Sequence, residues 1–341
     1  MIDPSLPLID LHRHLDGSVR LATVLDLAER HGLVLPARDL EGLRAHVQIS
    51  GQARGVMEFI ARFRWLTEVM ADPEACRRIA YEGVEDARAE GIDYLELRFS
   101  PWFMAERHGL DPAAVVDAVA DGVEAARRDF GARVGLIGIL SRTYGAEVAK
   151  RELEALLTHR TRLVALDLAG DEARFPAALF TDHFRRARDA GWRITVHAGE
   201  AAGPESVWSS IRDLGAMRIG HAVRAIEDPR LLDHMREHGI GIEANLTSNV
   251  QTSSVPGFAA HPLRRFLDDG LLANINTDDP TISGIDLRHE FEVAAPAAGL
   301  TAAHTRRAQE CALEMAFLEP AARRAVLAAK SGTPPAQGGY S

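Results

Sequence analysis

The sequence has few cysteines and no long apolar run. Its two cysteines, Cys76 and Cys311, are too few for a disulfide framework or a cysteine-based zinc site, and we expect both to be small core side chains. No run approaches the ~20 apolar residues of a membrane span. The first residues, MIDPSLPL, lack the basic and apolar regions of a signal peptide. These absences favour a cytoplasmic protein with no membrane contact.

Positive charges are outnumbered by negative charges. The chain has 39 lysines and arginines against 49 aspartates and glutamates, which gives a formal net charge of −10. A nucleic-acid backbone is therefore not expected as a partner. Lysine itself occurs only twice, as Lys150 and Lys330. The hydrophobic fraction of 46% is ordinary for a globular protein.

Short apolar runs alternate with longer helical patterns along most of the chain. Runs that are apolar almost throughout are typical of parallel strands buried on both faces. Helical patterns such as 113–130 and 261–270 separate them, and the second ends in a glycine typical of a helix C-cap. The alternation predicts an α/β fold, a (β/α)8 TIM barrel. Its eight strands are expected at residues 7–12, 94–100, 133–140, 163–170, 193–199, 218–223, 241–246 and 272–279.

Two segments depart from this even repeat. Residues 21–90 hold several helical patterns, so extra helices are expected after strand 1, and residues 301–330 predict further helices at the C-terminus. We expect a single barrel domain over 1–330 and a disordered Pro/Gly-rich tail over 331–341. The segment 55–70 is either a lid above the barrel mouth or an ordinary amphipathic helix, and its apolar residues are Met57, Phe59, Ile60 and Phe63.

Polar side chains collect where the predicted strands end, which is the active-site face of such a barrel. His12 and His14 are two residues apart on one strand and therefore point to the same side. His197 ends the fifth strand, and Asp278 lies at the end of the eighth. Three neutral imidazoles and a carboxylate suit Zn²⁺. A water that completes the shell would have its pKa lowered toward ~7, which makes it a nucleophile at neutral pH.

The number of metal ions follows from the scarcity of lysine. Barrel hydrolases with two metals often bridge the ions with a carbamylated lysine at a strand end. Neither Lys150 nor Lys330 follows a predicted strand. We therefore expect one zinc ion per chain.

Three more residues are candidates for proton transfer. Glu200, in the loop after the fifth strand, is a candidate general acid. His221 and Asp279 remain to orient the water and to move protons. Adjacent strand residues face opposite sides, so Asp278 and Asp279 cannot both be ligands in a regular strand. Pro280 ends the ladder and frees Asp279 to turn toward a substrate, although a turn or cap role for Asp279 is the alternative.

The motifs HRHLDG, HAGE, TSN and NTDDP, in this order and spacing, resemble the adenosine deaminase family over residues 5–330. Stretches such as LDLAGDE, ARDAGW and VHAGEAAGPES are especially similar to its bacterial members. The resemblance implies the same barrel, one zinc ion and the hydrolytic deamination of adenosine and 2′-deoxyadenosine in purine salvage. Hydroxide would add at C6, and ammonia would leave. The implied zinc ligands are His12, His14, His197 and Asp278.

The resemblance also implies roles at the substrate. Glu200 would donate a proton to purine N1, and His221 would orient or deprotonate the attacking water. Asp279 would hold this water and N7, the Gly170 N–H would meet N3, and Asp16 would bind the ribose 5′-hydroxyl. The expected substrate contacts are thus His14, Asp16, Gly170 and Asp279.

Some features leave the substrate open. Asp16 favours a nucleoside, because adenine-specific relatives carry Glu at this position, and no basic cluster near the motifs suggests a phosphate pocket. The stretch Gly220-His221-Ala222 departs from the usual Gly-His-Gly, so the Ala222 methyl either narrows the purine space or points away. The segment EANLTSN, residues 243–249, also differs from commoner forms. The alternatives are a deaminase of another 6-aminopurine, such as adenine or a modified nucleoside, and a non-catalytic purine-binding protein.

Overall fold

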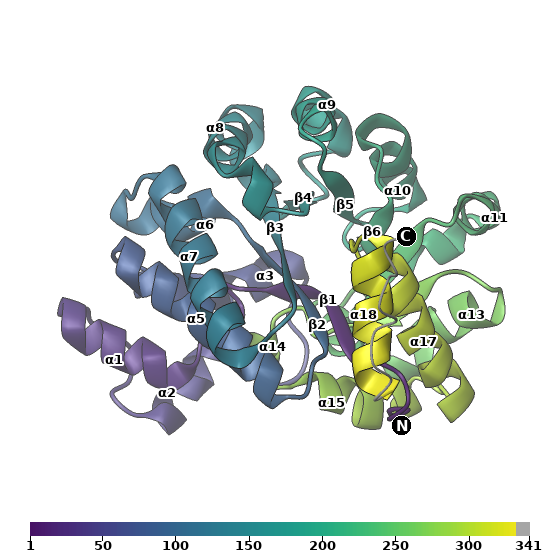
Figure 1. Ribbon diagram of the computed structural model, residues 1–341, viewed down its shortest axis with the longest axis horizontal. Helices are drawn as coiled ribbons and strands as arrows, with labels where there is room; N and C mark the ends of the chain where they lie inside the picture. Colours follow the sequence, from purple (N-terminus) through teal and green to yellow (C-terminus); the bar gives the residue numbers. More distant parts are fainter. Residues whose placement is uncertain (332–341) are drawn as a thin grey trace, which may run out of the picture.

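The computed structural model describes residues 1–331, and its eight parallel strands form one sheet in chain order (Figure 1). All eight predicted strands are confirmed, with ends that differ by a few residues. The (β/α)8 barrel is therefore confirmed. The strands are β1 (Ile9–His14), β2 (Tyr94–Phe99), β3 (Val134–Ser141), β4 (Ala165–Ala169), β5 (Arg193–Ala198), β6 (Arg218–His221), β7 (Gly241–Ala244) and β8 (Ala273–Ile275).

The barrel closes between its last strand unit and its first. The Asp278 N–H donates to the His12 carbonyl over 2.8 Å, and the His14 N–H donates to the Asp278 carbonyl over 2.8 Å. These bonds form a parallel bridge beyond the end of β8. Closure therefore holds Asp278 beside the two histidines of β1 through backbone hydrogen bonds.

Helices surround the barrel, and most of them lie between one strand and the next along the chain (Figure 1). The predicted helix at 113–130 is confirmed as α7, and the pattern at 261–270 contains the shorter α13. Those between strands are α5 (Pro73–Ala89), α6 (Pro101–Ala105), α7 (Pro112–Phe130), α8 (Gly145–Thr158), α9 (Thr181–Asp189), α10 (Pro204–Ser209), α11 (Pro229–His238), α12 (Leu246–Gln251) and α13 (Leu263–Asp268).

The predicted extra helices are present at both places. The insertion after β1 holds α1 (Leu21–His31), α2 (Leu40–Val47), α3 (Val56–Ile60) and α4 (Arg64–Glu68) ahead of α5. The chain after β8 forms α14 (Pro280–Ser283), α15 (Leu287–His289), α16 (Ala295–Ala297), α17 (Ala302–Met315) and α18 (Pro320–Ser331). Within residues 1–331, no helix is both long enough and apolar enough to cross a membrane.

Strand β1 shows how the barrel wall separates packing from chemistry. Ile9 and Leu11 belong to a buried apolar cluster with Cys311 of α17. His12 and His14 alternate with them and face the barrel interior. Cys311 and Cys76 are both buried and free, so the expectation that they are core residues is confirmed.

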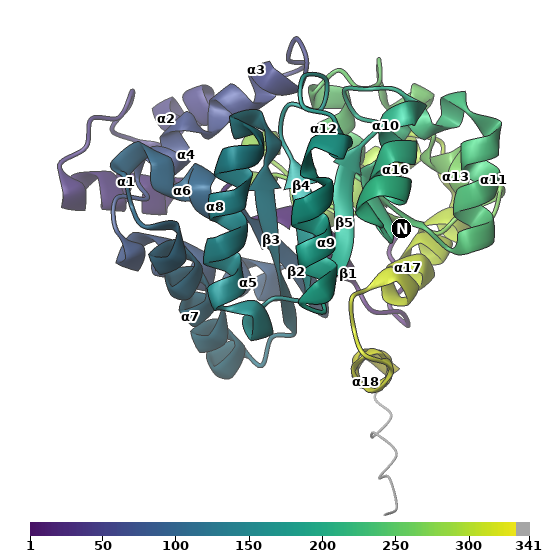
Figure 2. The same cartoon turned by 90° about the horizontal axis from the view of Figure 1, so that it is seen from above.

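The segment 55–70 is broken rather than continuous. A short 3₁₀ turn separates α3 from α4, and α3 lies at one end of the barrel near α12 (Figure 2). Phe59, Ile60 and Phe63 line a cavity at this end, whereas Met57 does not and is 40% exposed. The lid interpretation is therefore supported for three of the four side chains and is wrong for Met57.

The predicted tail at 331–341 lies outside the described residues except for Ser331, which ends α18. The assignment of residues 1–330 to a single domain stays a prediction.

Candidate active site and metal centre

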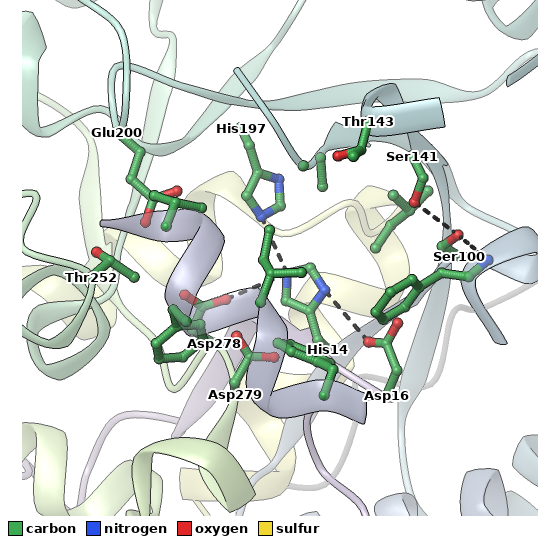
Figure 3. Close-up of a pocket in the computed structure, with 18 of the residues that line it drawn as sticks. His14, Asp16, Ser100, Ser141, Thr143, His197, Glu200, Thr252, Asp278 and Asp279 are labelled. Carbon is green, nitrogen blue, oxygen red and sulfur yellow. Dashed lines mark hydrogen bonds and ion pairs between the residues drawn. The ribbon is translucent and has the colours of Figure 1, made fainter. Parts of the chain in front are cut away.

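A cavity of about 760 Å³, counting its open mouth, lies at the carboxyl-terminal end of the barrel (Figure 3). Among the predicted site residues, only His12 does not line the cavity, because it lies beneath and is fully buried. The others all line it: His14, Asp16, Gly170, His197, Glu200, His221, Asp278 and Asp279.

Five of these side chains converge on one point. Donor atoms of four buried residues, His12, His197, His221 and Asp278, lie within 4.8 Å of one another. His14 reaches the same point, since its Nε2 lies 3.2 Å from His197 Nε2 and 3.4 Å from Asp278 Oδ1. Figure 3 shows His14, His197 and Asp278 pointing toward a shared space. A cation could be held here.

The spacing of the donor atoms fits a metal ion. His12 Nε2 is buried without a hydrogen-bond partner, although it lies 3.2 Å from Asp278 Oδ1. Two imidazole nitrogens, on His14 and His197, face each other at 3.2 Å. Ligands roughly 2.0 Å from a tetrahedral ion lie about 3.3 Å apart. The observed separations match this value, and the nitrogen and carboxylate donors suit zinc.

Two carboxylates orient the candidate ligand rings. His12 Nδ1 lies 2.8 Å from Glu243 Oε2, and His197 Nδ1 lies 3.0 Å from Asp167 Oδ2. A carboxylate accepts a hydrogen bond from the Nδ1–H group of a histidine, which leaves Nε2 without a proton and free to bind a metal. Our reading of the sequence missed both residues. The available signal was a single charged residue inside each apolar strand, because a buried charge requires a partner.

Arg98 joins the two carboxylates. Its guanidinium donates to Asp167 Oδ2 and to Glu243 Oε2, each over 2.8 Å, and the side chain is fully buried. Burial alone would raise the pKa of Asp167, but His197 and Arg98 hold that pKa below its usual value. Both carboxylates therefore stay ionised as acceptors for the histidines.

Glu200 is held by the loop that carries it. Gly199, with φ of +71°, turns the chain after β5. The Glu172 carboxylate then accepts four consecutive backbone N–H groups, from Gly199 at 2.6 Å, Glu200 at 3.1 Å, Ala201 at 2.7 Å and Ala202 at 2.9 Å. Glu172, within the LDLAGDE stretch, is a further functional candidate that the sequence reasoning did not identify.

The surroundings of Glu200 favour its protonated form. Burial, reinforced by the charge of Asp278, raises the pKa of Glu200 to about 8. His221 Nε2 lies 3.6 Å from Glu200 Oε2. A carboxyl that keeps its proton near neutral pH can serve as a general acid.

Asp278 and Asp279 both reach the cavity because neither lies in a strand. Strand β8 ends at Ile275, and Asp278 has φ of +62°. The expected strand through residue 279 is therefore too long, and the alternation of its side chains does not apply. Pro280 opens α14, as expected for a residue that stops the ladder. Burial raises the pKa of Asp279 well above its usual value, and the charge of Asp278 adds to this effect.

Ala222 lies away from the cavity. It is fully buried and does not line the pocket, although His221 beside it does. Both residues have positive φ, 65° for His221 and 53° for Ala222. Of the two sequence alternatives, the structure favours a methyl that points away from the substrate space.

A parallel barrel with imidazoles and carboxylates at its mouth is the architecture of the (β/α)8 hydrolases that hold a metal ion. Residues 7–330 match the family model for adenosine deaminase. The chain belongs to the adenosine deaminase family.

Individual relatives agree with this assignment. An adenosine deaminase from Edwardsiella ictaluri is 59% identical over 330 residues, which cover 97% of this chain and 99% of the relative. An amidohydrolase from Burkholderia ambifaria, crystallised with bound zinc, is 27% identical with a TM-score of 0.86, over 96% of this chain and 90% of the other. The adenine deaminase of Arthrobacter aurescens is 24% identical with a TM-score of 0.89, over 96% and 98% of the two chains, and supports the fold alone.

Proposed function

We propose that this chain is a zinc-dependent enzyme that hydrolyses adenosine and 2′-deoxyadenosine to inosine and 2′-deoxyinosine, with release of ammonia. The observation that carries the proposal is one cavity in which a set of metal-ligand side chains faces a carboxyl that keeps its proton. The relative at 59% identity, an adenosine deaminase, supports the same reaction.

The proposed ligands are His12, His14, His197 and Asp278. His14 is preferred to His221 because its Nε2 lies 3.4 Å from Asp278 Oδ1, whereas His221 Nε2 lies 3.8 Å from Asp278 Oδ2. Zinc at this point would supply Lewis-acid activation of a water molecule at neutral pH. Neither lysine lines the cavity, which supports the expectation of one ion per chain.

The remaining polar residues move protons. Glu200 donates its proton to purine N1, which makes C6 electrophilic as water adds there. Asp279 and His221 hold the attacking water, and His221 either orients it or takes its proton. When the tetrahedral adduct collapses, the C6–N bond breaks and the amino group leaves as ammonia, so water and nucleoside become inosine and ammonia.

Asp16 supports a nucleoside substrate. Its Oδ1 is buried without a hydrogen-bond partner on the cavity wall, so it is available to a ribose hydroxyl. Burial raises the pKa of Asp16 to about 7. Gly170 has a φ of +110°, and a Cβ atom added to it would lie 2.4 Å from Thr143 Oγ1. Because it has no side chain, its backbone is accessible to the purine edge. The described lining contains no lysine or arginine, which favours a nucleoside over a nucleotide.

The test is turnover by purified protein with its metal content measured on the same sample. Adenosine, 2′-deoxyadenosine, adenine and an N6-modified nucleoside are compared by kcat/KM, with the ultraviolet change and ammonia release as readouts. Glu200→Gln, purified in parallel, controls for a contaminating host deaminase. Metal-loaded protein without adenosine turnover would overturn the proposal, and a preference for adenine would favour the alternative substrate. The cytoplasmic location stays a prediction.

A further inference from the structure

A chain of hydrogen bonds runs from a backbone amide to the ring of His221. The Leu263 N–H donates to His261 Nδ1 over 3.1 Å. His261 Nε2 lies 3.0 Å from Asn249 Oδ1, and Asn249 Nδ2 lies 2.8 Å from His221 Nδ1. Asn249 and His261 are buried, and neither has a role in the reaction described above. Asn249 is the last residue of the TSN motif.

The direction of the chain is fixed at its backbone end. A backbone N–H can only donate, so His261 Nδ1 accepts and carries no proton. Burial lowers the pKa of His261 to about 3, so its ring is neutral with one proton, which must sit on Nε2. His261 Nε2–H therefore donates to the Asn249 side chain and requires an oxygen at that position.

The same reasoning fixes the Asn249 amide. If the amide were turned over, its NH₂ group would face the proton on His261 Nε2, which places two donors against each other. The NH₂ group therefore points at His221, whose Nδ1 must accept. Asn245 Nδ2 approaches the same nitrogen at 3.3 Å. His221 Nδ1 thus faces donors and is held without a proton.

We propose that Asn249 and His261 are positioning residues that keep the single proton of His221 on Nε2, an inference that rests on the proposed deaminase function for its catalytic meaning. His221 Nε2 faces the cavity, 3.6 Å from Glu200 Oε2 and 3.8 Å from Asp278 Oδ2. A ring with this proton donates to the attacking water and does not deprotonate it. It also cannot bind a metal through Nε2, which leaves that position to His14.

The tautomer can be read directly. In a long-range ¹H–¹⁵N correlation spectrum of zinc-reconstituted protein, the His221 ring is assigned by its loss in His221→Gln. We expect a protonated Nε2 and a bare Nδ1, whichever purine proves to be the substrate. A proton on Nδ1 overturns the inference, even if the enzyme is an active deaminase. Conversely, absence of nucleoside turnover would refute the proposed function and leave this spectrum as a valid test.

Variants test whether the chain matters for catalysis. Asn249→Leu keeps the side-chain size and removes the donor, so kcat should fall by about 10–100-fold with KM changed by less than about 3-fold. His261→Leu should lower kcat by about 10-fold, whereas His261→Gln, which keeps an N–H donor, should restore most of it. The matched control is His183→Gln, because His183 Nε2 bonds only the Ala146 carbonyl, at 2.9 Å. Wild-type kcat in Asn249→Leu, with an unchanged His221 spectrum, would overturn the inference.

Discussion

Gly17 of the HRHLDG motif gives the sharpest test of the site geometry. A Cβ atom built at Gly17 would lie 1.8 Å from Asp279 Oδ1, 2.6 Å from its Cγ and 2.8 Å from its Cβ. Real Cβ contacts stay beyond 3.0 Å, so in Gly17→Ala the Asp279 carboxylate must retreat by about 1.2 Å. The backbone itself tolerates alanine, because Gly17 is not among the residues with positive φ.

The expected cost follows from this displacement. Asp279 is proposed to hold the water and the purine, and a misplacement of about 1 Å at a reacting group costs about 100-fold in rate. This factor corresponds to about 2.7 kcal/mol of transition-state stabilisation. We expect kcat/KM for adenosine to fall by this amount in Gly17→Ala while the metal content stays at the wild-type level, because the three atoms nearest to the new methyl all belong to Asp279, which is not a proposed metal ligand.

The assay pairs this variant with Gly257→Ala. Gly257 has an extended φ of 167°, and a Cβ there meets nothing within 4 Å, so its kcat/KM should not change. Melting temperatures of both proteins show whether a loss of activity reflects unfolding. A folded, metal-loaded Gly17→Ala enzyme with kcat/KM within about 3-fold of wild type would refute the assigned position of Asp279.

Further outcomes are expected at four positions. Glu200→Gln should lose at least about 1000-fold in kcat with its metal retained, and activity in this variant would remove Glu200 from its role. Wild-type kcat should fall as the pH rises past the raised pKa of Glu200, about 8, since the acid form is the active one. Asp16→Glu should lower kcat/KM for nucleosides more than for adenine, and an equal loss would argue against a ribose contact. Glu172→Gln should lower kcat by about 10–100-fold, because one of its oxygens becomes a donor facing backbone N–H groups, and kinetics alongside circular dichroism would separate this effect from unfolding. Ala222→Gly should leave kcat/KM within about 2-fold, because the methyl lies outside the cavity; a large gain would mean that it narrows the purine space.

The barrel was predictable because its signal is local. Each strand is a short apolar run, and each run is separated from the next by a helical pattern. The carboxyl end of β8 was predicted less well. The strand stops at Ile275, and the letters NTDDP reveal neither this early end nor the left-handed backbone of Asp278. His12 and His14 could be paired from their spacing alone, because side chains two residues apart on a strand point to the same face.

The groups that orient the site were not predictable in this way. Glu172, Asn249 and His261 act on neighbours that lie 27 or more positions away or across a turn, through contacts that depend on side-chain direction. A buried histidine in a helical or loop pattern is ordinarily structural, so the sequence gives no sign that His261 acts on the site. Its significance depends on the acceptor state of His261 Nδ1, and only the Leu263 N–H reveals it.

Charge balance in the barrel interior provides a separate argument for a divalent ion. Two buried guanidiniums, those of Arg98 and Arg218, are joined by ion pairs to Glu96, Asp167 and Glu243, and His12 links this network to Asp278. With neutral histidines, the two positive charges of these ion pairs face four carboxylates, so the ion-paired network carries two excess negative charges, of which the buried Arg142 guanidinium offsets part through Asp167. Excess negative charge in a buried network is costly, and a bound divalent cation would reduce it. The strands that carry these residues read as apolar one at a time, and the imbalance emerges only when the barrel register brings them together.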